Sequence, residues 1–335
     1  MIYNLLIIFA LVNTPLFFFY KKIVSVFNLY DKGDNFRKLQ KKAVPLTGGL
    51  IICYNFIIFF LINYFYNLEI IDQLFITSKR EFFTFLAIPL IFYFFGYIDD
   101  KYNINANVKL IVLSTFVTIS ILLDDKYIIS ELNFSFLTSP INLLNFSFFI
   151  TLLCSLLFIN ALNMFDGIDL QVGSYVIVIL IIFIIKSVLV NLSIVLIFTI
   201  LLFLYYNYKK KSYLGNSGVL FLGYLVSYFF IKANNLNSKI FNADEIFVIM
   251  LLPGLDMFRL FFYRIISGRH PFSADRKHIH HLLLNSFSER KTYFILQGFI
   301  IFSIAGYYLI HYKFYFIIIL LFLYFFLINF ILRKN

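Results

Sequence analysis

The chain has 335 residues, of which 61% are hydrophobic and 13% are charged, and its formal net charge is +11. Soluble domains are roughly 45–50% apolar and about 25% charged, so this composition excludes a soluble globular enzyme, a disordered chain and a coiled coil. We therefore expect an all-α, polytopic membrane protein. In so apolar a chain, basic cytoplasmic loops and anionic ligands explain the positive charge better than nucleic acid does.

Eleven apolar runs approach the ~20 residues that a helix needs to cross a bilayer. Basic residues orient them, because cytoplasmic loops are rich in Lys and Arg. With the N-terminus outside and the C-terminus in the cytoplasm, 21 of the 28 Lys and Arg lie on the inner side. No repeat or long linker is visible, so we expect one domain over 1–335. The predicted spans are 2–20, 47–67, 82–98, 108–123, 142–162, 172–189, 192–208, 217–233, 244–263, 292–310 and 313–332.

Five polar segments are unlike ordinary connecting loops, and this topology places all of them on the cytoplasmic side. Their shared side predicts one functional site. The segments are 31–49, 96–109, 160–170, 209–218 and 253–281. The corresponding site loops are expected near 21–46, 99–107, 163–171, 209–216 and 264–291.

The paired carboxylates Asp99 and Asp100 end the third predicted span. Two adjacent carboxylates at a membrane edge repel each other unless a cation neutralises them. Mg²⁺ takes such oxygen ligands together with substrate phosphates. A solvated helix end is the alternative. The pattern is not the DDxxD motif of prenyl synthases, because Asn103 occupies the last position.

A second polar motif ends the fifth predicted span. Asn160, Asn163, Asp166 and Asp169 recur every three residues, which places them along one side of a helical turn. Gly167 interrupts that turn and lets backbone approach a ligand closely. Amide and carboxylate groups at this spacing favour a ligand site over a simple polar cap.

Two further segments suggest anion binding. The stretch 215–218, Gly-Asn-Ser-Gly, follows three lysines and opens a predicted helix, which is a weak signal for a phosphate cradle. The stretch 270–281 contains four of the five histidines. Zinc binding and a solvated loop are alternatives there, but no cysteine accompanies the histidines. Arg276 and Lys277 lie beside them and favour a diphosphate as the ligand.

In this order, the segments resemble those of the polyprenyl-phosphate N-acetylhexosamine-1-phosphate transferases, the glycosyltransferase 4 family. The resemblance extends from residue 31 to residue 281 and is carried by 45–49, 96–100, 160–169 and 271–281. The run Asp-Arg-Lys-His-Ile-His-His at 275–281 is similar to the undecaprenyl-phosphate N-acetylglucosamine-1-phosphate transferases. That branch begins O-antigen, teichoic acid and capsule synthesis, and differs from the peptidoglycan branch.

The resemblance implies a reaction. HexNAc-1-phosphate would pass from a UDP-N-acetylhexosamine to undecaprenyl phosphate with release of UMP, at a bacterial inner (cytoplasmic) membrane and with Mg²⁺ or Mn²⁺ as cofactor. Direct attack by the lipid phosphate is favoured over a covalent aspartyl intermediate. The implied catalytic residues are Asp99, Asp100 and Asp166, which with Asn216 would bind the metal. The implied substrate-binding residues are Lys42, Asn163, Asp169, Arg276, His278, His280 and His281.

Two departures from the family pattern leave alternatives open. Asn216 stands where relatives have a metal-binding aspartate in Gly-Asp-x-Gly-Ser, and Leu170 follows Asp169 where relatives have glycine. Asn216 makes a catalytically impaired member one alternative, whereas Leu170 implies an altered nucleotide or sugar pocket. A transporter or flippase of lipid-linked sugars is another, although such proteins place ionisable groups near the bilayer midplane, often with repeats. The sequence determines neither the sugar nor the oligomeric state, and a homodimer is compatible with it.

Overall fold

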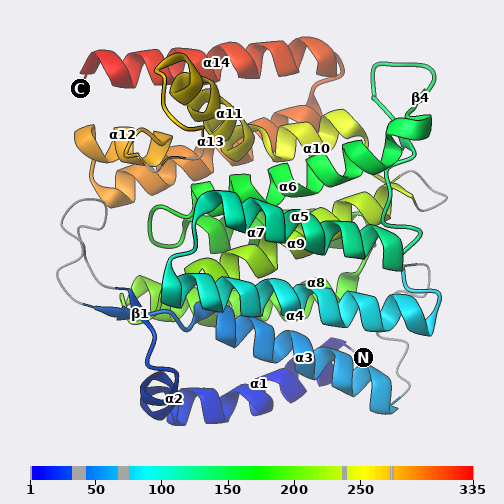
Figure 1. The fold of residues 1–335 in the computed structure, drawn as a ribbon, viewed down its shortest axis with the longest axis vertical. Helices are drawn as coiled ribbons and strands as arrows, with labels where there is room; N and C mark the ends of the chain where they lie inside the picture. The colour runs from blue at the N-terminus through cyan, green and yellow to red at the C-terminus, as the bar shows by residue number, and fades with distance from the viewer. Residues whose placement is uncertain are drawn as a thin grey trace. The chain divides into compact units, whose positions relative to one another are not determined.

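The computed structural model describes residues 2–31, 43–66, 75–235, 240–271, 273 and 275–334. Nearly all regular structure within these ranges is helical (Figure 1). Lipid cannot bond to backbone N–H and C=O groups, and a helix satisfies them within its own segment. The described strands are two short antiparallel pairs: β1 (Tyr30–Asp31) with β2 (Val44–Pro45), and β3 (Glu131–Leu132) with β4 (Ile141–Asn142).

The described residues form fourteen α-helices. They are α1 (Ile2–Phe18), α2 (Tyr20–Phe27), α3 (Gly48–Tyr66), α4 (Lys79–Tyr102), α5 (Ala106–Leu123), α6 (Ser147–Phe165), α7 (Gln171–Ile185), α8 (Val190–Tyr208), α9 (Gly215–Asn234), α10 (Ala243–Ile249), α11 (Leu251–Ile266), α12 (Ile279–Ser286), α13 (Glu289–Leu309) and α14 (Lys313–Lys334). A single 3₁₀ turn, η1 (Leu144–Phe146), precedes α6 within the described chain.

The described helices support a polytopic membrane protein but not a count of eleven spans. Eight are long and apolar enough to cross a membrane, and counting each of two bent pairs as one span gives ten. Each of the eleven predicted runs does coincide with a helix or a bent pair. The run 172–189 corresponds to α7, whose 15 residues extend about 22 Å at 1.5 Å per residue. That length falls short of the ~30 Å hydrocarbon core, so α7 does not qualify on length.

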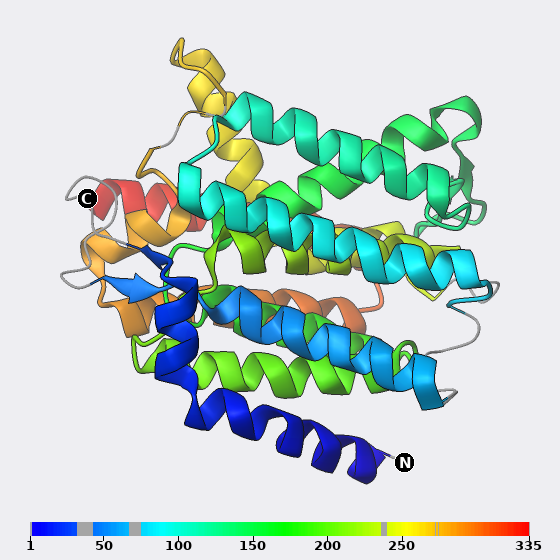
Figure 2. The same ribbon diagram turned by 60° about the horizontal axis from the view of Figure 1, so that its bottom comes forward.

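One of the two bent pairs interrupts a predicted run, 244–263, and the other bends at the end of the predicted run 2–20. The axes of α1 and α2 differ by 67°, with the break at Phe19, as the dark blue helices of Figure 2 show. The axes of α10 and α11 differ by 77°, with the break at Met250. Pro253 lies in the first turn of α11, where its missing N–H costs no helical hydrogen bond. A new helix can therefore begin there.

Internal contacts divide the chain into two compact units, whereas the sequence predicts one domain over 1–335. Both units are discontinuous in sequence. The first comprises Met1–Asn105, Leu122–Asp124 and Val172–Leu225, and the second comprises Ala106–Ile121, Asp125–Gln171 and Val226–Asn335. The polar motifs are consequently described below unit by unit.

Each unit is held together by buried apolar and aromatic side chains. In the first, α3 packs on α4 and α8, and Phe56 of α3 meets the edges of Phe85 and Phe221. In the second, α13 packs on α10, α11 and α14. A buried cluster there includes Val248, Tyr307 and Leu320. Between helices in a membrane such side chains contribute chiefly through van der Waals packing, because lipid is itself apolar.

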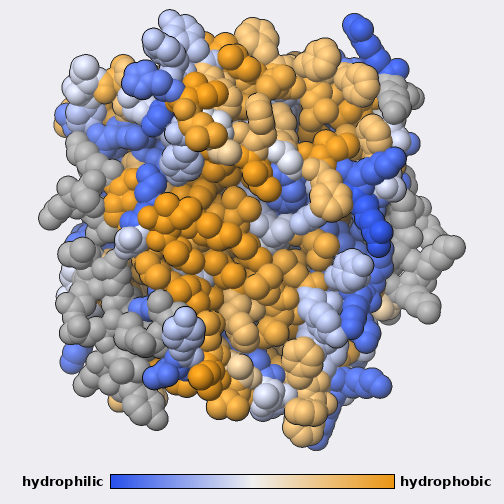
Figure 3. Space-filling view, turned by 180° about the vertical axis from the view of Figure 1, so that it is seen from behind, coloured by the Kyte–Doolittle hydropathy of each residue, from blue (hydrophilic) through white to orange (hydrophobic). Residues whose placement is uncertain are grey.

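Large apolar side chains also lie on the outside of the helices. Figure 3 shows them covering much of one face of the molecule. In α14, Phe322 is 73% exposed and Phe326 is 71% exposed. Apolar surface on this scale is expected of helices that face lipid. The observed surface therefore agrees with the membrane class predicted from composition.

Candidate functional site

In the first unit, three of the predicted motifs meet at the start of α9. The segment 45–49 runs alongside the loop that leads into this helix. The N–H of Gly48 donates to the carbonyl oxygen of Tyr213 at 3.0 Å, and the N–H of Tyr213 donates to that of Pro45 at 2.9 Å. The Gly49 N–H donates to the Leu214 carbonyl oxygen at 3.1 Å. These backbone bonds fix the position of the α9 N-terminus.

Glycines allow the other helices to reach the same point. A Cβ at Gly96 of α4 would lie 2.5 Å from the Cα of Ser217. A Cβ at Gly49 of α3 would lie 2.5 Å from the backbone nitrogen of Gly218. Real Cβ atoms do not approach backbone so closely. Glycine in the motifs at 45–49 and 96–100 is therefore explained by direct backbone contact with α9.

The carboxylate of Asp100 binds the first turn of α9. Its Oδ1 accepts the N–H of Asn216 at 2.8 Å, and its Oδ2 accepts the N–H of Ser217 at 3.0 Å. A helix N-terminus has unpaired N–H groups and a partial positive charge, both of which favour an anion. The sequence suggested that this turn could cradle a phosphate, but two of its N–H groups are bonded to Asp100.

Asp99 stabilises the turn that follows α4. Its side chain is buried, and its Oδ1 accepts the N–H of Ile104 at 3.0 Å. Asn103, the residue between them that ends the helix, has a left-handed backbone with φ 51°. The two predicted catalytic carboxylates thus bind different backbone segments, one in the loop after α4 and one in α9.

The donor set of the first unit fits a hard cation that binds together with a phosphate. A carboxylate oxygen has two lone pairs, so those of Asp100 can each accept more than the one N–H they bond. Among the residues that the structure describes, no three His, Cys, Asp or Glu side chains form a group able to hold a metal ion. Mg²⁺ commonly uses one or two carboxylates plus substrate phosphates. Asp99 and Asp100 meet that requirement in chemical type.

In the second unit, α6 ends earlier than the spacing of its polar residues predicts. Asn163 lies in its last turn, but the helix ends at Phe165, and Asp166 is the C-cap residue with φ −78° and ψ 71°. Asp169 lies in the loop before α7. The four polar residues therefore do not share one helical side. Asp166 is exposed at the helix end, where a ligand can reach it.

The histidine motif lies against this loop. A Cβ at Gly167 would be 2.0 Å from Nε2 of His280, so the imidazole ring rests on the glycine backbone. The ring of His280 lies 4.3 Å from that of His281 and 5.5 Å from that of His278, measured between centroids. The loop 166–169 and the histidines, far apart in sequence, thus form one local site.

His280 contributes a neutral ring to this site. It is 2% exposed, and its Nδ1 has no hydrogen-bond partner among the described residues. Burial, followed by the charges of His281 and His278, lowers the pKa of His280 to about 3. At neutral pH the ring can therefore bind a phosphate oxygen through an N–H donor, but not as a cation.

A buried ion pair holds the basic loop that precedes the histidines. Nε of Arg264 donates to Oδ2 of Asp275 at 2.8 Å, and Nη1 of Arg264 donates to the Pro271 carbonyl oxygen at 2.9 Å. The Lys277 N–H donates to Oδ1 of Asp275 at 2.8 Å. Burial alone would raise the pKa of Asp275, but these hydrogen bonds and the Arg264 charge hold it below its usual value. Arg276 is exposed next to this anchored segment.

One residue of this site was not predicted from the sequence. Asp256 of α11 is 3% exposed and bonds His278, Arg259 and the backbone of Ile279. The sequence analysis counts Arg259 and Arg264 only among the 21 inner Lys and Arg residues. A lone aspartate with an arginine three residues later in an apolar helix is the signal that could have identified this group, because buried charges require partners.

The predicted site residues thus fall into two groups, one in each unit. Asp99, Asp100 and Asn216 lie in the first unit; Asn163, Asp166, Asp169, Arg276, His278, His280 and His281 lie in the second. Asn216 contributes its backbone N–H to Asp100. Lys42 lies outside the described residues. The functional roles of these residues stay predictions.

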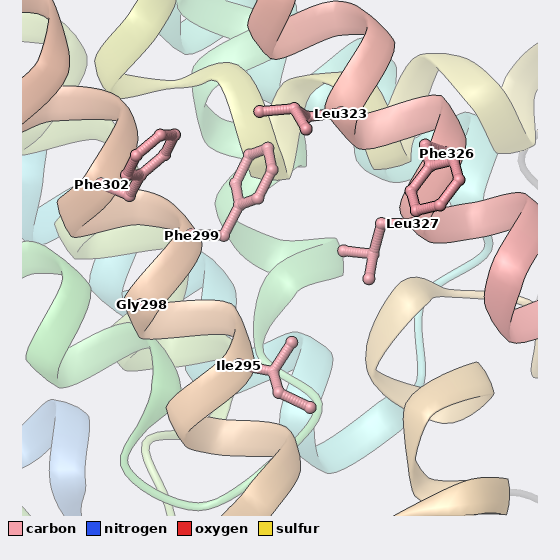
Figure 4. Close-up of a pocket in the computed structure, with 7 residues that line it drawn as sticks. All are labelled: Ile295, Gly298, Phe299, Phe302, Leu323, Phe326 and Leu327. Carbon is pink, nitrogen blue, oxygen red and sulfur yellow. The ribbon is translucent and has the colours of Figure 1, made fainter.

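A groove of about 370 Å³ on the second unit has a different character (Figure 4). It lies between α13 and α14, and every lining residue is apolar. These are Ile295, Gly298, Phe299, Phe302, Leu323, Phe326 and Leu327. Without a polar side chain it offers no group for phosphate chemistry.

The contact between Gly167 and His280 gives a direct test of the second group. Gly167→Ala should force the buried ring out of place, and overpacking of this kind typically costs about 1–3 kcal/mol. The midpoint of thermal unfolding in detergent should fall. Gly298→Ala is the matched control, because a Cβ there meets nothing within 4 Å. Equal midpoints for the two variants would contradict the packing described.

The low pKa of His280 predicts a pH-dependent stability. An unfolded histidine binds a proton near pH ~6.5, whereas folded His280 does so near pH 3. Between these values the unfolded state binds more protons, so the free energy of unfolding should fall as pH decreases, by up to ~1.4 kcal/mol per pH unit. Unfolding midpoints measured from about pH 7 to about pH 5 should therefore decline less in His280→Gln than in the wild type. Parallel declines would rule out His280 as their source.

Comparison with known proteins agrees with the family that the sequence motifs predict. The model of glycosyl transferase family 4 matches residues 82–234. An undecaprenyl-phosphate alpha-N-acetylglucosaminyl 1-phosphate transferase of Escherichia coli (strain K12) is 27% identical over 307 residues, which cover 87% of this chain and 79% of the relative. A probable undecaprenyl-phosphate N-acetylglucosaminyl 1-phosphate transferase of Bacillus subtilis (strain 168) is 29% identical over 309 residues, which cover 89% and 81%. These matches agree with the family predicted from the sequence motifs: over residues 82–234 the chain is similar to glycosyl transferase family 4.

Proposed function

We propose that this chain transfers HexNAc-1-phosphate from a UDP-N-acetylhexosamine to undecaprenyl phosphate and releases UMP. The similar proteins are named undecaprenyl-phosphate N-acetylglucosaminyl 1-phosphate transferases, which supports the transfer of a phosphosugar to this lipid. The observation that carries the proposal is the contact between Gly167 and the His280 ring. It brings two motifs of this family, more than 100 residues apart in sequence, into one local site with exposed Asp166 and Arg276.

The lipid acceptor accounts for the architecture. Its prenyl chain requires apolar surface, and its phosphate requires a polar site at the membrane edge. The donor is soluble and cytosolic, so the site loops should face the cytoplasm. This agrees with the distribution of Lys and Arg, which places the N-terminus outside and the C-terminus inside. We accordingly assign the protein to the inner membrane of a bacterium.

A one-step transfer suits the groups available. An oxygen of the lipid phosphate attacks the β-phosphorus of the UDP-sugar, and the bond from that phosphorus to the oxygen bridging the α- and β-phosphates breaks, so that UMP leaves. A phosphate monoester has a second pKa near ~6, so the acceptor is mostly dianionic at neutral pH without a strong base. The protein must chiefly hold two anions together. Exposed Arg276 supplies positive charge for that purpose, and neutral His280 supplies a hydrogen bond.

Asp99 and Asp100 are the residues best suited to hold Mg²⁺ or Mn²⁺, with Asn216 of the same unit as a further proposed ligand. Such an ion, when bound, offsets charge on the diphosphate oxygens. Asp100 already fixes the α9 N-terminus, so it would link metal binding to the position of that helix. A second possibility is that the chain is a catalytically impaired member of the family. Asn216 favours it, because its amide side chain lacks the negative charge of the aspartate found in relatives.

The carboxylates provide the main test. Asp99→Asn, Asp100→Asn and Asp166→Asn should each lower UMP release by at least ~100-fold, the scale of losing one strong transition-state contact. Asp125→Asn is the control, because Asp125 is exposed in a loop between α5 and β3. Gel filtration in detergent should show that each variant stays folded. Full activity in all three folded variants would refute the proposed site, and absence of UMP release from the wild type would favour the transporter.

Asn216 provides a test of the metal assignment. Asn216→Asp restores a negative charge and should lower the Mg²⁺ concentration that gives half-maximal UMP release, because Coulomb attraction at ligand distance is large. Binding of Mn²⁺, followed by electron paramagnetic resonance, should tighten in parallel. Asn142→Asp makes the same change at an exposed strand residue and should alter neither measurement. If Asn216→Asp leaves both unchanged, Asn216 is not a metal ligand.

A further inference from the structure

Asp256 forms three hydrogen bonds in the histidine site of the second unit. Its Oδ2 lies 2.9 Å from Nδ1 of His278. Its Oδ1 accepts the N–H of Ile279 at 3.1 Å and Nη2 of Arg259 at 2.7 Å. One buried carboxylate therefore holds a side chain, a backbone group and a cation.

These contacts determine which nitrogen of His278 carries the proton. A guanidinium stays protonated in proteins, so Arg259 keeps Asp256 ionised. An ionised carboxylate only accepts hydrogen bonds, and Nδ1 of His278 must therefore be the donor. Nε2 is then the ring nitrogen left for a ligand. No residue that the structure describes bonds Nε2, and the residue as a whole is 9% exposed.

The same carboxylate also fixes the ring's surroundings. His278 is the N-cap residue of α12, and Ile279, whose N–H Asp256 accepts, is the first residue of that helix. The His278 ring is within 2° of parallel to the ring of His280. His280 in turn rests on Gly167. Asp256 therefore sets both the orientation of His278 and the start of the helix that carries the other histidines.

Arg259 holds the other side of this arrangement. Its Nη2 also donates to the Lys277 carbonyl oxygen at 2.6 Å, and its Nε donates to the Tyr324 hydroxyl at 3.2 Å. Arg259 is thus bonded to Asp256, to the residue before His278 and to α14. Together these bonds leave the His278 ring little freedom to turn.

We infer that Asp256 is the positioning residue of this site, which fixes His278 so that Nε2 faces the diphosphate of the UDP-sugar. The inference rests on the proposed function, because the ligand of His278 is taken to be that diphosphate. Charge grows on the departing UMP phosphate as the reaction proceeds. A histidine held in place for it should therefore act more on kcat than on KM.

A double-mutant cycle tests this role. Asp256→Asn should lower kcat for UMP release by about 10- to 100-fold, the usual effect of removing the carboxylate partner of a functional histidine, with a smaller change in KM for UDP-N-acetylglucosamine. In a His278→Gln background, Asp256→Asn should cost less than about twofold more, because the two residues act as one unit. Losses that multiply independently would overturn the inference while leaving the transferase activity intact.

A matched control separates positioning from general stability. Asp244 is also a buried aspartate of the second unit, 2% exposed, and it bonds Ser135 and the Tyr307 hydroxyl. Any loss caused by Asp244→Asn should be the same with or without His278→Gln. If Asp244→Asn shows the same non-additivity as Asp256→Asn, the cycle reports lost folding, and the inference fails.

Folding is checked by gel filtration and by the unfolding midpoint in detergent. If Asp256→Asn alone does not stay folded, the cycle is repeated on Arg259→Gln, which removes the guanidinium that the lost carboxylate would leave unpaired. Full activity in His278→Gln would overturn the inference, because His278 would then not touch the reacting groups. Absence of UMP release from the wild type would overturn the proposed function itself.

Discussion

A charge inside an apolar helical protein persists only where another group pairs with it, because an isolated ion loses most of its hydration there. This constraint determines how the second unit presents its polar residues. Arg264, 1% exposed, pairs with Asp275, and Asp256 pairs with Arg259 and His278. The Arg264–Asp275 and Asp256–His278 pairs join α11 to the segment that follows it. The segment that carries the exposed Arg276 is therefore anchored on both sides of that residue, although it contains little regular structure.

The first unit satisfies the same constraint with backbone in place of side-chain cations. Asp100 receives two N–H groups from the start of α9, and Asp99 receives one from the turn after α4. Because Gly49 and Gly96 let α3 and α4 touch α9, these bonds form over short distances. The carboxylates thus have a structural role that is independent of any metal. If these carboxylates also bind a metal ion, Asp100 must accept the cation while it keeps its hydrogen bonds to the α9 N-terminus.

Hydropathy predicted most of the helices. It did not predict where the backbone changes direction. Apolar residues lie on both sides of Met250, so α10 and α11 looked like one straight span, whereas the predicted run 2–20 ends beside the bend at Phe19 and leaves out most of α2. Val188 and Leu189 continue the apolar run beyond the end of α7, so a 15-residue helix looked long enough to span. Asp166 and Asp169 were placed on one helical side because spacing does not reveal where a helix ends. Asp256 was missed because its role depends on His278, which is distant in sequence.

The sequence motifs indicated the function more directly than the helical fold does. Short polar segments carried the resemblance to the family. The structure adds which of those segments meet: 45–49, 96–100 and 215–218 in one unit, 160–169 and 275–281 in the other. That arrangement explains several glycines by close backbone contact, a role that the sequence pattern alone does not distinguish from ligand binding.

The central claim is that a phosphosugar, and not the sugar alone, moves to the lipid. The most direct measurement uses UDP-N-acetylglucosamine with radioactive phosphorus in the β-phosphate, undecaprenyl phosphate and the purified protein in detergent. The account predicts that the label moves into the lipid fraction and that the released UMP is unlabelled. Label recovered in released UDP would show transfer of the sugar alone and would contradict it, as would a lipid product that forms without UMP.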